Sequence, residues 1–258
     1  MDMHQKPVSS HLSRLDTNAS ITITKDMFEK MYLTPQLPVK GQLRKTLGNP
    51  TPLALLGFLL STTSFGCEAM QWRGAKMGSA LIGMYYFYGG LLQIIGAIFE
   101  LIIGNTFPCV VFGTFGAFWL AIGVTEQYVL PNAVDKTATS SSSGFFFCFL
   151  GLLCFIFLIC SLRTNLVFVF IFVFLEIAVL LIAASYWYMA EGLEDQATKL
   201  QKGGGACVFI FSIAGWYLLL SIMLQSVDFP LSCPVGDLST RFIGMSARNK
   251  KNDEENTA

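Results

Sequence analysis

Charge is scarce in this sequence of 258 residues: Asp, Glu, Lys and Arg make up only 13% of it. A soluble globular protein carries about 25% charged residues, roughly twice this share. Apolar residues make up 53% and the mean hydropathy is +0.56, which excludes disorder and a disulfide-rich secreted scaffold. The formal net charge is zero, so no nucleic-acid partner is expected. What remains is an integral membrane protein.

Side chains that carry out catalysis or bind metals are also scarce. The chain has two histidines, His4 and His11, and its seven cysteines form no CxxC pair. We expect those cysteines to be free thiols that pack as small apolar side chains. No glycine-rich loop followed by Lys and Ser or Thr is present, so no ATP-driven step is expected. The sequence therefore predicts neither an enzyme nor a metal or cofactor site.

Long apolar runs predict an all-α fold with six transmembrane helices, since one span needs roughly 20 apolar residues. They cover about 53–66, 79–103, 109–124, 145–161, 165–189 and 203–227. We expect polar loops at 126–143 and 191–202, and we interpret Gly203–Gly205 as a flexible hinge or turn. One transport domain, 49–228, then lies between polar tails at 1–48 and 229–258. No apolar signal-peptide segment opens the chain, so the first span is expected to direct insertion.

The distribution of basic residues predicts the orientation. With six spans both termini lie on one side, and the tails and loops on that side hold twelve of the 17 Lys and Arg residues. Cytoplasmic segments are enriched in these residues. We therefore expect both termini in the cytoplasm.

Two glutamates fall within the apolar runs. Glu100 lies near the end of the second run and Glu176 near the middle of the fifth. An acidic residue at the centre of a span costs about 2.5–3.5 kcal/mol, so such residues usually face the bundle interior and serve a function. Proton coupling is one role for both residues. A structural role stays open for each: Glu100 can reach interfacial water, and Glu176 can take part in a polar packing pair.

Small and polar residues repeat at helical spacing in two of the runs. One stripe comprises Gly89, Gln93, Ala97, Glu100 and Gly104, and another comprises Gly113, Ala117 and Ala121. Such stripes allow close helix packing, and Gln93 suggests that the first borders a polar path. Pro50 and Pro108 suit early helical positions, with Asn105 as a cap. Free N–H groups at these two helix starts could attract an anion.

Three motifs in order resemble the acetate uptake transporter family, which includes the bacterial succinate–acetate permease and the fungal "ammonia transport outward" proteins. The first is Asn49-Pro-Thr-Pro-Leu-Ala-Leu-Leu-Gly-Phe58. The second is Tyr88-Gly-Gly-Leu-Leu-Gln93, continuing through Glu100 to Gly104-Asn-Thr-Phe107. The third is Phe115-Gly-Ala-Phe-Trp119. They span about 70 residues, and the long tails look more like fungal members.

The resemblance implies a homo-hexamer of six-helix protomers that moves acetate and similar monocarboxylates, in several cases with protons. Each protomer would hold a pore with an apolar constriction, to which Phe58, Phe115 and Leu175 correspond. Phe115 replaces a tyrosine of the bacterial permease, and Glu176 replaces a threonine. Candidate polar residues along the path are Asn49, Ser61, Thr62, Gln93 and Thr114.

The function predicted from these observations is proton-coupled transport of short carboxylates across the plasma membrane. Acetate needs apolar walls for its methyl group and a few donors for its carboxylate. Ammonium or ammonia export, or a passive channel, is a second class. A sensor or scaffold that signals through its Ser- and Thr-rich tail is a third.

Overall fold

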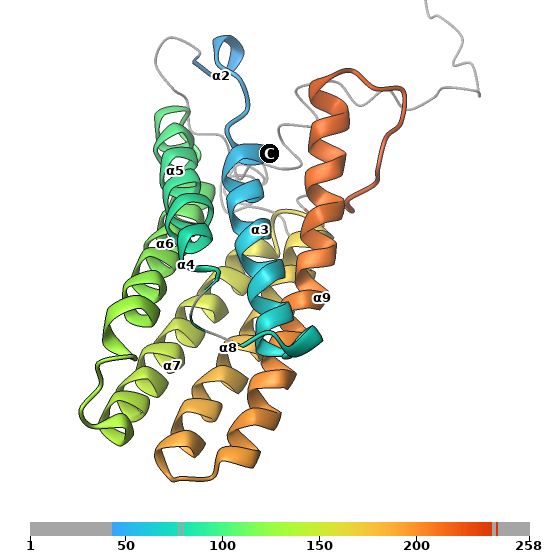
Figure 1. Ribbon diagram of the computed structural model, residues 1–258. Coiled ribbons are helices and arrows are strands. Elements are labelled where there is room, and N and C mark those ends of the chain that lie inside the picture. Colours follow the sequence, from blue (N-terminus) through green and yellow to red (C-terminus); the bar gives the residue numbers. More distant parts are fainter. Residues whose placement is uncertain (1–42, 77, 79, 239–240, 242–258) are drawn as a thin grey trace, which may run out of the picture.

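The computed structural model describes residues 43–76, 78, 80–238 and 241 (Figure 1). The predicted N-terminal tail, with both histidines, therefore lies almost wholly outside the described residues, as does most of the C-terminal tail. Within the described ranges the fold is helical and has no strand beyond one isolated bridge between Asn165 and Asp237.

Six helices are long and apolar enough to cross a membrane, which confirms the predicted number of spans. The first is α3 (Thr51–Ala69), preceded by the short α2 (Leu43–Thr46) and followed by η2 (Trp72–Gly74). The second joins α4 (Ile82–Met84), the π-helix η3 (Tyr85–Leu92) and α5 (Gln93–Ile102). The third joins α6 (Thr106–Val124) and the π-helix η4 (Thr125–Val129). The last three are α7 (Lys136–Ser161), α8 (Leu166–Ala190) and α9 (Glu194–Ser226).

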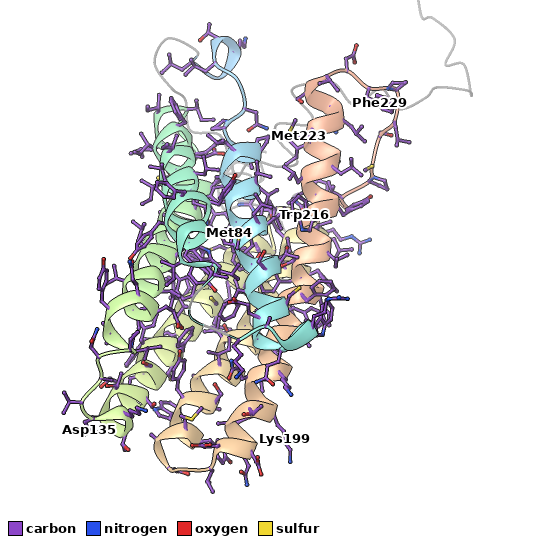
Figure 2. The ribbon with its side chains drawn as sticks, viewed as in Figure 1. Met84, Asp135, Lys199, Trp216, Met223 and Phe229 are labelled. Atoms are coloured by element: carbon purple, nitrogen blue, oxygen red, sulfur yellow. The ribbon has the colours of Figure 1, made fainter. Side chains whose placement is uncertain are left out.

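The helices form a bundle in which α8 packs against both α7 and α9, α9 packs against α3, and α5 packs against α6 (Figure 1). Asp135, between α6 and α7, and Lys199, in the first turns of α9, lie at one end (Figure 2). Met223 and Phe229 lie at the other end, near the start of α3 (Figure 2). The buried apolar side chains form one core cluster between the helices.

Two predicted loops were too long, because polar residues extend the helices beyond the apolar runs. The serine tract belongs to α7, whose cap Asp135 accepts a 2.9 Å hydrogen bond from Ala138 N. Ser143 donates to Thr139 O at 2.9 Å, so its hydroxyl is satisfied within the helix. Helix α9 begins at Glu194, where Glu194 and Asp195 complement the positive end of the helix dipole.

The expected hinge at Gly203–Gly205 was also wrong, because these glycines lie inside α9. A Cβ at Gly205 would lie 2.8 Å from Ala69 Cβ and 3.0 Å from Gly66 O of α3. A Cβ at Gly204 would lie 2.9 Å from Ile182 Cγ1 of α8. The glycines therefore let α9 pack closely against both neighbouring helices.

The first predicted small-residue stripe is buried except for Gly104, which is half-buried, and the second stripe is not buried. Gly89, Gln93, Ala97 and Glu100 are all buried against the other helices. In the α6 stripe, by contrast, Ala117 and Ala121 are exposed. The close contact of α6 is made instead by Gly116, whose added Cβ would lie 2.8 Å from Ile94 Cγ1. Helical spacing identified small residues but not which of the possible α6 faces is buried.

The segment after α9 folds back along the bundle. Pro234 O accepts a 2.7 Å hydrogen bond from the Tyr217 hydroxyl, and Val235 is buried in the core cluster. Leu166 N donates to Gly236 O at 2.8 Å, and Leu238 N donates to Thr164 O at 3.0 Å. These contacts attach residues 234–238 to α9, to the α7–α8 connection and to the start of α8.

Candidate functional site

A narrow cavity of about 40 Å³ lies in the middle of the bundle. It is bounded by α3, α6, α7, α8 and α9, so residues distant in sequence meet there. The surface of this cavity is apolar, although Thr62, which carries a hydroxyl, is among the lining residues. The other lining residues are Phe58, Phe65, Phe115, Phe118, Trp119, Phe147, Leu150, Leu175, Ala178, Val179, Ile182, Val208 and Phe211. A cavity of this size holds very few water molecules, and its apolar walls give them little to bind.

The structure brings the three residues predicted for the constriction to this one cavity. The rings of Phe58 and Phe115 are tilted, with centroids 5.6 Å apart, and both residues are buried. Leu175 approaches the cavity from α8. Phe211 of α9, which the sequence analysis missed, stacks on Phe58 with centroids 5.8 Å apart. No motif distinguished Phe211 from the other 22 phenylalanines of the chain.

Thr62 is the predicted polar residue that lines the cavity. Its hydroxyl bonds to Phe58 O at 2.9 Å and to Ser212 Oγ of α9 at 3.0 Å. These contacts join α3 to α9 immediately beside the cavity. Since the Thr62 hydroxyl bonds both to the Phe58 carbonyl and to Ser212 of α9, it also helps to fix the position of Phe58, which lies one turn earlier in α3.

Ser61 and Gln93 are buried close to Gly89 but do not line the cavity. A Cβ at Gly89 would lie 2.8 Å from Ser61 Oγ and 2.5 Å from Trp119 Cγ. Gln93 Nε2 donates to Gly89 O at 2.7 Å. Ser61 Oγ, Gln93 Oε1 and Trp119 Nε1 have no hydrogen-bond partner in the described structure. Unpaired polar atoms at such depth are uncommon, so this region has unused hydrogen-bonding capacity.

Asn49 and Thr114 lie away from the cavity. Asn49 is exposed, and its Oδ1 accepts a 3.0 Å hydrogen bond from Thr51 N at the start of α3. Thr114 is half-buried on α6 and is not among the lining residues. The hydrogen bond from Thr51 N explains Asn49 as a residue that stabilises the start of α3.

Glu100 connects the starts of two helices. It is fully buried, and its Oε1 accepts a 2.5 Å hydrogen bond from Thr51 Oγ1 of α3. Its Oε2 accepts a 2.6 Å hydrogen bond from Asn105 Nδ2, just before α6. Asn105 therefore directs its side chain to Glu100 rather than capping α6, contrary to prediction. The acidic group found beside these two helix starts is a carboxyl of the protein itself.

Glu176 lies between α8 and α7, away from the central cavity. Its Oε1 would be 3.7 Å from a Cβ at Gly151 of α7, and it is close enough to interact electrostatically with Cys154. Its Oε2 is buried and has no hydrogen-bond partner among the described residues. All seven cysteines are free, as expected, although Cys154 alone among them is buried and Cys160 is exposed.

Six helices long and apolar enough to span a membrane, five of which bound a central apolar cavity, define a multi-pass membrane protein, and the chain matches transporters and channels. It belongs to the GPR1/FUN34/yaaH family, whose pattern it matches over residues 31–240. This family membership confirms the resemblance drawn from the three motifs.

The relatives are fungal. "Protein alcS" of Aspergillus fumigatus is 41% identical over 259 aligned positions, covering 95% of this chain and 94% of the relative. "Acetate transporter protein patA" of Aspergillus clavatus is 31% identical, covering 94% of this chain and 96% of the relative. "Ammonia transport outward protein 3" of Saccharomyces cerevisiae is 26% identical, covering 66% of this chain and 61% of the relative.

The fold matches that of a solved bacterial protein, described as the bacterial acetate channel SatP. The TM-score is 0.61 at 23% sequence identity, and the match covers 74% of this chain and 99% of the bacterial chain. The bundle described above is therefore the fold of that channel.

Proposed function

We propose that this protein carries acetate and similar short monocarboxylates across a membrane, coupled to protons, through the central cavity. The observation that carries the proposal is the convergence of Phe58, Phe115 and Leu175 on one narrow apolar cavity. Relatives named as acetate transporters support the choice of substrate. The homo-hexamer, the cytoplasmic termini and the plasma-membrane location belong to the same proposal.

The apolar cavity accounts for a requirement for protons. A bare carboxylate loses its hydration at the ring of Phe58, Phe115 and Phe211, and unpaired burial of a charge is costly. Protonation, or transient pairing with a proton donor, lowers that cost. The aromatic and aliphatic walls accommodate the methyl group of the acid.

The test is uptake of labelled acetate by the purified full chain in liposomes, with and without an inward proton gradient. Phe58→Ala, which opens the cavity, is compared with Phe149→Ala, which alters a phenylalanine on the exposed face of α7. We expect gradient-stimulated uptake that Phe58→Ala changes and Phe149→Ala leaves intact. Uptake no higher than in empty liposomes would refute acetate transport.

Ammonium export is the second candidate, because two Saccharomyces cerevisiae relatives are named ammonia transport outward proteins. The same liposomes loaded with labelled methylammonium distinguish the two. Methylammonium efflux without acetate uptake favours export. Acetate flux that ignores the gradient favours a passive channel.

A further inference from the structure

Four ionisable side chains lie close together near the end of α3, where the chain leaves this helix. They are Glu68 near the end of α3, Tyr85 at the start of η3, Glu126 of η4 and Tyr186 of α8. Both glutamates are buried, with 6% and 7% of their surface exposed. The Tyr85 hydroxyl donates to Glu68 Oε2 at 3.3 Å. Neither glutamate was singled out from the sequence.

The two carboxyls are close enough to interact with each other, both interact with Tyr85, and Glu126 also interacts with Tyr186. Glu126 accepts no hydrogen bond from the described residues. Gly78 approaches it so closely that an added Cβ would lie 2.8 Å from Glu126 Oε2.

No basic side chain of the described segments neutralises the pair. The nearby connection between α3 and α4 carries Arg73 and Lys76, but both are exposed and neither is an interaction partner of Glu68 or Glu126. The titratable groups facing the pair are therefore Tyr85 from η3 and Tyr186 from α8. Two neighbouring carboxylates shielded from water cannot both remain charged without a counter-ion. A single proton is the simplest counter-ion for the pair to bind.

Aromatic rings connect this pair to the cavity. Tyr85 stacks on Trp119 with centroids 4.9 Å apart, and Tyr186 stacks on Phe147 with centroids 5.4 Å apart. Both Trp119 and Phe147 line the cavity. Each tyrosine thus has a cavity-lining ring on one side and a carboxyl on the other.

The pair also lies beside a route to water. An open groove of about 480 Å³ between α6 and α7 is lined by hydroxyl groups of Thr125, Thr139, Ser142 and Ser143, and by Tyr186. Thr125 directly precedes Glu126. Phe147 borders both this groove and the central cavity. The groove therefore offers a proton an approach toward the pair that does not pass through the cavity.

We propose that Glu68 and Glu126 share one exchangeable proton, and that this pair is the proton-binding site for transport. The proposal rests on the proposed acetate transport. The proton joins one carboxylate oxygen and later leaves it, and no other bond changes. When it is bound, the pair carries one negative charge instead of two and repels an approaching acetate anion less. In the predicted orientation this end faces outward, so external acid speeds uptake.

The experiment measures acetate uptake into liposomes while the external pH is stepped from neutral to mildly acidic, with uptake by empty liposomes subtracted. The full chain is compared with Glu68→Gln, Glu126→Gln and the double variant. Glu191→Gln, an exposed carboxyl just after α8 at the same end, is the matched control. We expect each single variant to lose the acid-stimulated component by roughly tenfold, because an amide cannot take up a proton and the remaining carboxyl no longer has a charged neighbour that favours protonation.

The double variant and the control sharpen the result. A shared proton predicts that the double variant loses no more than either single variant, and that Glu191→Gln behaves as the unmodified chain. A wild-type pH profile in Glu126→Gln would overturn the proposal. The proposal would also be overturned if the loss of acid-stimulated uptake in the double variant equalled the product of the two single losses. The two carboxyls would then act independently.

Failure of the proposed function gives a different pattern. Acetate flux that ignores pH in the unmodified chain overturns the proton site and leaves acetate transport standing. If acetate flux is absent, infrared spectra of the purified protein still decide the site. We expect a pH-dependent protonated-carboxyl band that disappears in Glu126→Gln. Persistence of that band in monodisperse Glu126→Gln refutes the site. Tyr85→Phe removes the hydroxyl donor and is expected to shift the pH midpoint of the band.

Discussion

Replacing Gly205 by alanine tests how closely α9 packs against α3. The new methyl group would lie 2.8 Å from Ala69 Cβ, 3.0 Å from Gly66 O and 3.1 Å from Met70 N. Two of these three neighbours are backbone atoms, so rotation of a side chain cannot relieve the contact. The two helices must move apart, and overpacking of this kind costs about 1–3 kcal/mol.

Gly203→Ala is the matched control, two residues earlier in the same helix. Its methyl group would meet Leu181 Cδ1 at 3.5 Å, an ordinary van der Waals contact. Both substitutions gain helix propensity, about 1 kcal/mol each, because both glycines lie in the interior of α9. This gain cancels in the comparison. The difference in unfolding free energy between the two variants therefore isolates the close approach, at about 1–3 kcal/mol.

The assay is thermal unfolding of the purified variants in detergent, followed by size-exclusion chromatography after heating. For a chain of this length each 1 kcal/mol shifts the midpoint by about 2–4 °C. We expect Gly205→Ala to melt below Gly203→Ala, and Gly203→Ala to melt at or above the unmodified chain. Equal midpoints for the two variants would refute the helix crossing. A marked loss of stability in Gly203→Ala would restore the hinge that the sequence suggested.

Three further predictions concern the cavity and the Glu100 contacts. Leu175→Ala should enlarge the cavity, lower stability by about 2–5 kcal/mol and admit bulkier carboxylates. Thermal unfolding measures the stability, and competition of longer acids with labelled acetate measures the selectivity. Unchanged selectivity would contradict a role for Leu175 in the constriction. Phe115→Tyr should raise acetate uptake severalfold by adding a hydroxyl donor to an apolar lining, and a fall in uptake would argue against a carboxylate passing this point. Glu100→Ala leaves the donors of Thr51 and Asn105 without this acceptor and should lower stability by about 2–5 kcal/mol. Thr51→Val should lower stability less, because it removes only one of the two contacts. Equal effects on the melting midpoint would show that the carboxyl of Glu100 does not hold both helix starts.

The sequence alone predicted six spans, because apolar runs of membrane length report directly on a hydrocarbon environment. It also identified Glu100 and Glu176 as residues whose burial needs an explanation. Helix ends were less predictable. The serine tract and the residues after Glu194 are polar enough to read as loops, yet local hydrogen bonds and the helix dipole stabilise them as helix.

Tertiary structure alone decided which of these residues meet. Phe211 contacts Phe58 from a helix about 150 positions away in the chain. The residues around Phe211 in the sequence are apolar throughout, so no periodic pattern distinguishes it from phenylalanines that face lipid. Glu68 and Glu126 stand at helix ends, where an acidic residue is expected to reach water. Only the packing of α3, η3, η4 and α8 buries both glutamates and makes them an interacting pair. The physical reason is that charge interactions depend on distance and on the exclusion of water rather than on position in the chain.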